Sequence, residues 1–117
     1  MKRPAPARLA GLSEVSEAMW QAEQARFREV LERQRAIEAA ISRLDTLLKR
    51  RFDPEAAEGD PAILASAEIA WRRWGNAERD KLLRDLARIR AESADQRDRM
   101  KRTFGRYDVL RQLTGKR

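Results

Sequence analysis

The stretch Asp53-Pro54-Glu55-Ala56-Ala57-Glu58-Gly59-Asp60-Pro61 decides the fold, because it holds two prolines and a glycine within nine residues. Proline in a helix interior costs about 3 kcal/mol, so no helix is expected to run through this stretch. On both sides the chain continues in charged segments rich in alanine and leucine that contain no further proline after Pro6. The chain therefore turns here, and the two flanking segments face each other.

Apolar residues recur on both sides of the turn at alternating steps of three and four, which is the spacing of a coiled-coil stripe. In the first segment, with a break in step (a stutter) through Glu23, they are Leu12, Val15, Met19, Phe27, Val30, Ile37, Ile41, Leu44 and Leu48. In the second segment they are Ile63, Ala67, Ala70, Trp74, Leu82, Leu86, Ile89, Met100, Tyr107 and Leu110. One stripe per segment predicts an all-α fold in which two long helices form an antiparallel coiled-coil hairpin.

We expect a single domain over residues 1–117, with a first helix over about 12–52, a tip over 53–60 and a second helix over about 61–114. Pro4, Pro6 or a cap on Ser13 are alternative starts of the first helix. The second helix is expected to start from a cap on Asp60, since Asp before Pro is a typical helix beginning.

Folding the chain at Ala56-Ala57 predicts the register of the pair. It places Phe27 level with Leu86, and Trp20 level with Ser93 and Ala94. The longer second helix then overhangs the first at the open end, where the termini meet, unless the first eleven residues are also helical.

The composition excludes several classes of function. The chain of 117 residues has no cysteine and no histidine, which excludes disulfides, thiolate or imidazole metal ligands and the usual acid–base and thiol catalysts. Its carboxylates alternate with arginines, as on solvated helix faces. We therefore predict no enzyme activity, no metal and no cofactor. No apolar run approaches the ~18 residues of a membrane span, and no secretory signal begins the chain, so we expect a soluble cytoplasmic protein.

The open end carries the clearest candidate binding surface. The net charge is +7, and residues 97–117 hold eight bases against two acids. A basic, partly apolar end favours an acidic partner. The candidate partner-binding residues there are Arg99, Arg102, Phe104, Arg106, Tyr107 and Leu110. The alternative is that the N-terminal segment folds back over them.

Two tryptophans form a secondary candidate surface. Trp71, in Trp71-Arg72-Arg73-Trp74, could stack on a nucleic-acid base, but its heptad position favours packing between the helices. Trp20 is either a packing anchor or an exposed contact, because the residues expected opposite it are small or polar.

Three segments bear on the class of protein: Ala36-Ile37-Glu38-Ala39-Ala40-Ile41, Trp71-Arg72-Arg73-Trp74 and Met100-Lys101-Arg102-Thr103-Phe104-Gly105-Arg106. In these segments and in its whole-length architecture, the chain resembles the stalk proteins of type III protein export, the flagellar FliJ family and its injectisome counterparts. The resemblance implies a non-enzymatic chaperone or stalk of the flagellum or of type III secretion. It also implies that the open end binds and modulates the export ATPase ring. The half nearer the tip, around Ile37, Ile41, Leu44, Ile69 and Trp71, would contact the export gate or export chaperones.

Two other functions remain open from the sequence. One is a scaffolding or adaptor coiled coil, monomeric or dimeric, in another assembly. The other, less favoured, is a basic hairpin that binds nucleic acid, whose affinity would fall steeply with salt.

Overall fold

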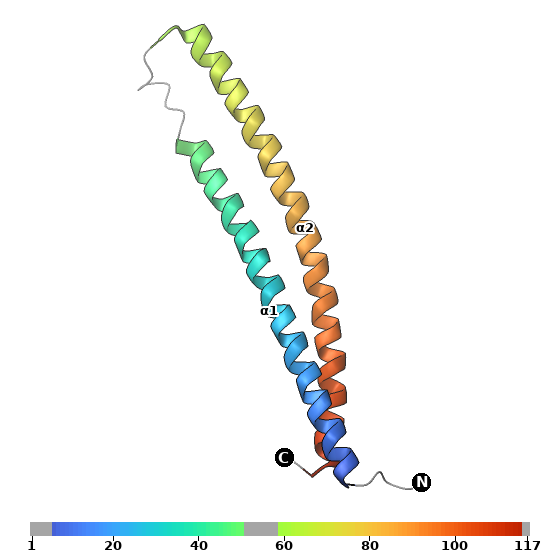
Figure 1. Ribbon diagram of the computed structural model, residues 1–117. Coiled ribbons are helices and arrows are strands. Elements are labelled where there is room, and N and C mark those ends of the chain that lie inside the picture. Colours follow the sequence, from blue (N-terminus) through green and yellow to red (C-terminus); the bar gives the residue numbers. More distant parts are fainter. Residues whose placement is uncertain (1–5, 51–58, 116–117) are drawn as a thin grey trace. The chain divides into compact units, whose positions relative to one another are not determined.

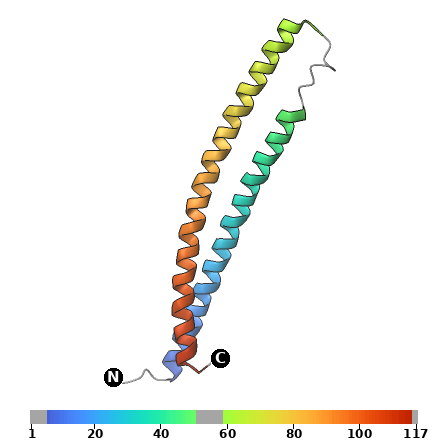
Figure 2. The ribbon, with the colours of Figure 1, turned by 180° about the vertical axis from the view of Figure 1, so that it is seen from behind.

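The structure is a computed structural model that describes residues 6–50 and 59–115. Two helices make up its regular structure in these residues, α1 (Pro6–Arg50) and α2 (Pro61–Leu113). The helices lie side by side and run in opposite directions (Figure 1, Figure 2). The prediction of an all-α hairpin of two long antiparallel helices is confirmed.

The helix ends follow local sequence signals. α1 begins at Pro6, one of the three starts that the sequence left open. α2 begins behind Asp60, whose Oδ1 accepts a hydrogen bond from the Ala62 amide at 2.9 Å. Gly59 precedes this cap with a φ of 141°, a conformation that favours glycine. The predicted end of the first helix at Phe52 and the predicted turn over 53–58 lie outside the described residues.

The chain divides into two compact units, each of which contains a stretch of both helices. Unit 1 comprises Met1–Glu32 with Ala91–Arg117, and unit 2 comprises Arg33–Arg90. Among the described residues, the buried apolar side chains are Val30 in unit 1 and Leu44, Leu86 and Ile89 in unit 2. Because a helix pair buries only one stripe of each helix, the apolar core is thin.

The contact stripe of α1, which we call its seam, follows one unbroken heptad. Its side chains are Leu9, Ser13, Ser16, Trp20, Glu23, Phe27, Val30, Gln34, Ile37, Ile41, Leu44 and Leu48. The prediction that Leu12, Val15 and Met19 belong to the seam is wrong, because these side chains are 47%, 59% and 49% exposed. Each precedes a seam residue by one position, about 100° around the helix. The seam thus passes through Glu23 without the predicted stutter.

The seam of α2 agrees with the prediction from Leu82 onward and differs before it. Its side chains are Leu64, Glu68, Trp71, Gly75, Glu78, Leu82, Leu86, Ile89, Ser93, Gln96, Met100, Thr103, Tyr107, Leu110 and Thr114. The predicted positions Ile63, Ala67, Ala70 and Trp74 are exposed, one residue away from the seam. Gly75 explains why the seam follows Trp71 and Gly75 and not Ala70 and Trp74. A Cβ at position 75 would lie 2.3 Å from Leu48 Cδ2, so Leu48 fits there only against a residue without a side chain. Two successive steps of four between Glu78 and Leu86 form a stutter in this helix.

The predicted register is wrong by about three helical turns. In unit 1, Phe27 lies under the guanidinium of Arg97, 5.6 Å from the ring centroid, and not opposite Leu86. Ten residues separate Arg50 from Pro61, and a connection of that length does not fix a register. The side chains that fit along the two seams fix it instead.

The shifted register moves the overhang to the other end of α2. In unit 2, Asp45 pairs with Arg79 at 3.0 Å, so the first turns of α2 extend past the last described turn of α1 (Figure 1). Ile63 and Ile69, in these turns, are 67% and 55% exposed. In unit 1, by contrast, α1 begins at Pro6 and extends along the end of α2. Of the two alternatives that the sequence left open for this end, the structure thus shows the covered one.

Candidate partner-binding surfaces

An aromatic cluster joins the two helices in unit 1. The ring of Trp20 stacks on that of Tyr107 with centroids 5.2 Å apart and an interplanar angle of 8°. Phe104 also contacts Trp20, with ring centroids 5.3 Å apart and an interplanar angle of 49°. Trp20 and Tyr107 are half-buried seam residues, whereas Phe104 is 41% exposed. Two of the candidate binding residues, Trp20 and Tyr107, therefore hold the helices together, and Phe104 remains accessible.

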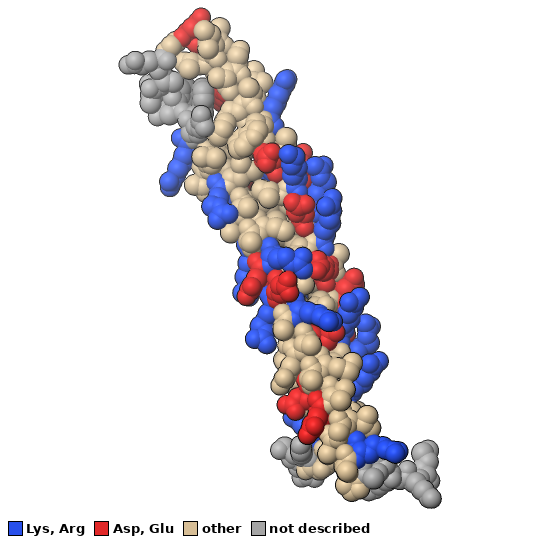
Figure 3. All heavy atoms as spheres, in the orientation of Figure 1, with Lys and Arg blue, Asp and Glu red and all other residues tan. Residues whose placement is uncertain are grey.

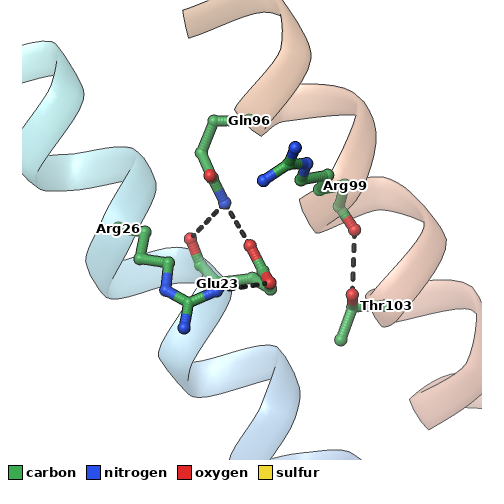
Figure 4. Close-up of polar contacts among 5 residues, drawn as sticks. All are labelled: Glu23, Arg26, Gln96, Arg99 and Thr103. Atoms are coloured by element: carbon green, nitrogen blue, oxygen red, sulfur yellow. Dashed lines mark hydrogen bonds and ion pairs between the residues drawn. The ribbon is translucent and has the colours of Figure 1, made fainter. Parts of the chain in front are cut away.

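The seam of unit 1 is otherwise mostly polar. Its buried polar residues are Ser13, Ser16, Ser93, Gln96 and Thr103. Gln96 Nε2 donates across the pair to the backbone oxygen of Glu23 at 3.4 Å and to Glu23 Oε2 (Figure 4). The Thr103 hydroxyl donates to the Arg99 carbonyl within its own helix at 2.9 Å. These bonds satisfy buried polar groups but bury little apolar surface. Beside these polar seam residues, the aromatic cluster therefore supplies most of the apolar contact between the two helices.

The seam defines two flanks of unit 1 that differ in composition. We call basic flank the exposed residues within 8–22 and 99–113 that stand one position before a seam residue: Arg8, Leu12, Val15, Met19, Ala22, Arg99, Arg102, Arg106, Val109 and Leu113. Further from the chain ends, the same side of unit 1 continues with Arg26, Glu29, Glu92 and Asp95. Both helices are right-handed and antiparallel, so a step of one residue back from the seam turns to the same side of the pair on each helix. These ten residues consequently share one side.

Within these bounds the basic flank has no acid, whereas the opposite flank has three over the same stretch. The acids on the side of the basic flank, Glu29, Glu92 and Asp95, lie beyond it, further from the chain ends. The opposite flank consists of residues one position after the seam, among them Glu14, Glu17, Gln21, Gln24, Arg97, Lys101, Phe104, Asp108 and Arg111. There Arg111 pairs with Asp108 at 3.1 Å. Elsewhere on the visible face, acids and bases are interspersed along the helices, as solvated helix surfaces are (Figure 3). The absence of acids within 8–22 and 99–113 of the basic flank is a local departure from this pattern.

The arginines of the basic flank are free to bind. Arg99, Arg102 and Arg106 form no ion pair with another described residue, whereas Arg26, Arg72, Arg79, Arg88, Arg90 and Arg111 do. Beside them, Val109 and Leu113 are 56% and 64% exposed. Together with the apolar side chains of α1, they form an exposed apolar surface next to unpaired positive charge.

The predicted binding residues thus separate in the structure. Arg99, Arg102 and Arg106 lie together on the basic flank. Phe104 lies on the opposite flank, and Leu110 is a half-buried seam residue like Tyr107. The sequence interpretation missed the apolar half of the basic flank because it assigned Leu12, Val15 and Met19 to the seam.

The secondary candidate, Trp71, lies in unit 2. Its ring stacks on that of Trp74 with centroids 4.9 Å apart. Trp71 also lines a surface depression of about 400 Å³ together with Leu48, Lys49, Glu68, Arg72 and Asn76. Glu68 and Arg72 pair with each other at 2.7 Å, which leaves Lys49 as the third charged side chain that lines this depression.

Neither described helix contains a stretch long and apolar enough to cross a membrane. Comparison with known proteins supplies no family: no family model, no curated protein and no solved structure matches the chain.

Proposed function

We propose that this protein is a non-enzymatic, protein-binding helical hairpin whose unit 1 is the docking end. The observation that supports the proposal best is the basic flank, where five large apolar side chains are about half exposed beside three arginines that form no ion pair with a described residue. Exposed apolar patches rimmed by polar residues mark interaction sites, because apolar surface in contact with water does not stabilise the free protein, whereas its burial stabilises a complex. Electrostatic attraction would speed the encounter and apolar contact would hold the complex.

The finer proposal is a cytoplasmic coupling stalk of type III protein export, with the export ATPase, the export gate or export chaperones as partners. The antiparallel helix pair with both chain ends in unit 1 supports it, as does the unlike chemistry of the two flanks. A hairpin with two different flanks inside a ring presents a different surface to each ring subunit. Unequal contacts of this kind bias the nucleotide states of the subunits, which is all that coupling requires.

The test is ATP hydrolysis by a purified export ATPase with and without the full chain, at low and at moderate salt. We expect stimulation that persists at moderate salt and is lost in the triple variant R99Q/R102Q/R106Q. A chain truncated after Met100 is a poorer probe, because it lacks Tyr107, the stacking partner of Trp20. The matched control is R28Q/R35Q/K101Q, which changes the net charge equally at positions one residue after the seam. No stimulation by the wild-type chain at either salt would refute the export role and leave an adaptor, monomeric or dimeric, of another assembly.

Nucleic-acid binding is the second candidate, and the unpaired arginines of the basic flank favour it. Three phosphate contacts predict a slope of about −2 to −3 in a plot of log affinity against log salt. A shallower slope, or binding that survives R99Q/R102Q/R106Q, would exclude this surface as a nucleic-acid site.

A further inference from the structure

We propose that the basic flank binds an acidic amphipathic helix, about four turns long, of a partner protein. The inference rests on the proposed function, protein binding through unit 1, and specifies the chemistry of the partner. The charge, the apolar side chains and their order along the helices all contribute to it.

The apolar part of the flank requires an apolar stripe on the partner. Leu12, Val15 and Met19 follow each other at steps of three and four on α1, so their side chains form one continuous ridge. Val109 and Leu113 form a second short ridge on α2, on the same side of the pair. A helix laid along the groove between two such ridges packs its own i, i+3 and i+4 side chains between them.

The charged part requires carboxylates at helical spacing. Arg99, Arg102 and Arg106 span about two turns of α2. The nearest acid on their side of the pair is Asp95, one turn before Arg99, and it forms no ion pair with a described residue. A guanidinium binds a carboxylate through two parallel hydrogen bonds, so a row of acids at matching steps of three and four would satisfy all three arginines. Arg8 lies on the same flank at its other end.

The order of these residues along the helix pair predicts which half of the partner helix is apolar and which half is acidic. Because Trp20 contacts Phe104 and Tyr107, the neighbouring Met19 comes level with about Arg106, and Leu12, two turns earlier, with about Leu113. The apolar cluster therefore occupies the end of unit 1 nearer the termini, and the arginines lie further inward. From Arg99 to Leu113 the flank runs about 21 Å, which a partner helix of about fourteen residues covers. We expect that helix to be apolar in one half and acidic in the other.

Other occupants fit the flank less well. A second copy docked through the same surface would bring arginines toward arginines, because the acids on this side, Glu29, Glu92 and Asp95, lie outside the flank. An anionic lipid surface or nucleic acid would satisfy the arginines, but membrane-binding faces and single-strand platforms use aromatic side chains, and the basic flank has none. Duplex phosphates would leave the five apolar side chains in water.

The test is selection from a displayed library of 18-residue helical peptides against the full chain at moderate salt. We expect the enriched peptides to combine an apolar stripe in one half with three or more acids in the other. Synthetic copies of the best peptide are then titrated into the variants L12Q/V15Q/M19Q and R99Q/R102Q/R106Q. Each variant should weaken binding at least about tenfold, while the control R28Q/R35Q/K101Q stays within about twofold.

Weaker peptide binding by these variants cannot be attributed to unfolding, because all the substituted side chains are exposed. Circular dichroism should show that their helix content is unchanged. Enriched peptides that carry no excess of acids would overturn the proposal, as would peptides that bind both flank variants as tightly as the wild-type chain. Duplex DNA and vesicles containing phosphatidylglycerol are titrated in parallel. Binding of either at moderate salt that depends on the flank, without a flank-dependent peptide, would assign the surface to that ligand instead. Since this assay measures peptide binding and not ATP hydrolysis, failure of the export role leaves its outcome unaffected.

Discussion

Alanine in place of Gly75 tests the close approach of the two helices in unit 2. Gly75 is buried, and a Cβ built on it would meet Leu48 Cδ2 at 2.3 Å, Cδ1 at 2.7 Å and Cγ at 3.0 Å. Real Cβ atoms essentially never approach other heavy atoms this closely, so either Leu48 must leave the seam or the helices must separate locally. Overpacking of this kind costs about 1–3 kcal/mol.

The magnitude follows from a comparison with a second helical glycine. Alanine is favoured over glycine inside a helix by about 1 kcal/mol, and this gain applies equally at Gly75 and at Gly105. A Cβ on Gly105 has no heavy atom within 4 Å, so Gly105→Ala should stabilise the protein by about 0.5–1 kcal/mol. Gly75→Ala combines the same gain with the steric cost, which leaves a net loss of up to about 2 kcal/mol. The difference between the two variants isolates the cost of displacing Leu48.

Urea unfolding of the full chain, followed by circular dichroism at 222 nm, measures this difference. We expect the midpoint to rise for Gly105→Ala and to fall for Gly75→Ala. Adding Leu48→Ala should remove most of the penalty of Gly75→Ala, because the clashing side chain is gone, and a double-mutant cycle gives the coupling between the two sites. If Gly75→Ala stabilises the chain as much as Gly105→Ala, the seam assigned to α2 is wrong and Trp74 again becomes a candidate seam residue.

Three further predictions concern the polar contacts. Asp60→Ala should cost about 1 kcal/mol of unfolding free energy through the lost cap, while Asp60→Asn should cost little, and thermal unfolding distinguishes them. Gln96→Leu alone should destabilise unit 1 by about 1–2 kcal/mol, because Glu23 loses its partner across the seam, whereas the double variant with Glu23→Leu should be neutral or stabilising in urea. A double-mutant cycle on Asp45 and Arg79, which are 39% and 42% exposed, should give less than about 1 kcal/mol, and that coupling should shrink in high salt. A larger, salt-independent coupling would contradict the exposed character of this pair.

Local signals in the sequence were sufficient for the fold class and for the helix start at Asp60. Proline and glycine act on their own turn of backbone, and a side-chain oxygen caps only the adjacent amides, so their effects need no tertiary partner. The regular heptad from Phe27 to Leu48 likewise gave the seam of α1 over that range, because apolar spacing there offers a single stripe. The arginines of the candidate surface could also be identified from the basic composition of the C-terminal segment.

Elsewhere two stripes compete, one residue apart. Leu12, Val15 and Met19 are more apolar than Ser13, Ser16 and Trp20, so apolar content alone favours the wrong stripe. The sequence nevertheless contained the signal that decides between them. The heptad of Phe27 continues backward without a break through Glu23 to Trp20, and only the polar stripe keeps that phase.

What the sequence by itself determined is the pair of helices and the turn between them, since backbone propensity and capping are local. The tertiary structure alone decided the register, through the fit of Trp20 on Tyr107 and of Leu48 on the bare backbone of Gly75. That fit depends on the shapes of side chains more than twenty residues apart, and a ten-residue connection imposes no alternative. The register in turn fixed which end of α2 is covered and left Leu12, Val15 and Met19 on the surface beside the unpaired arginines.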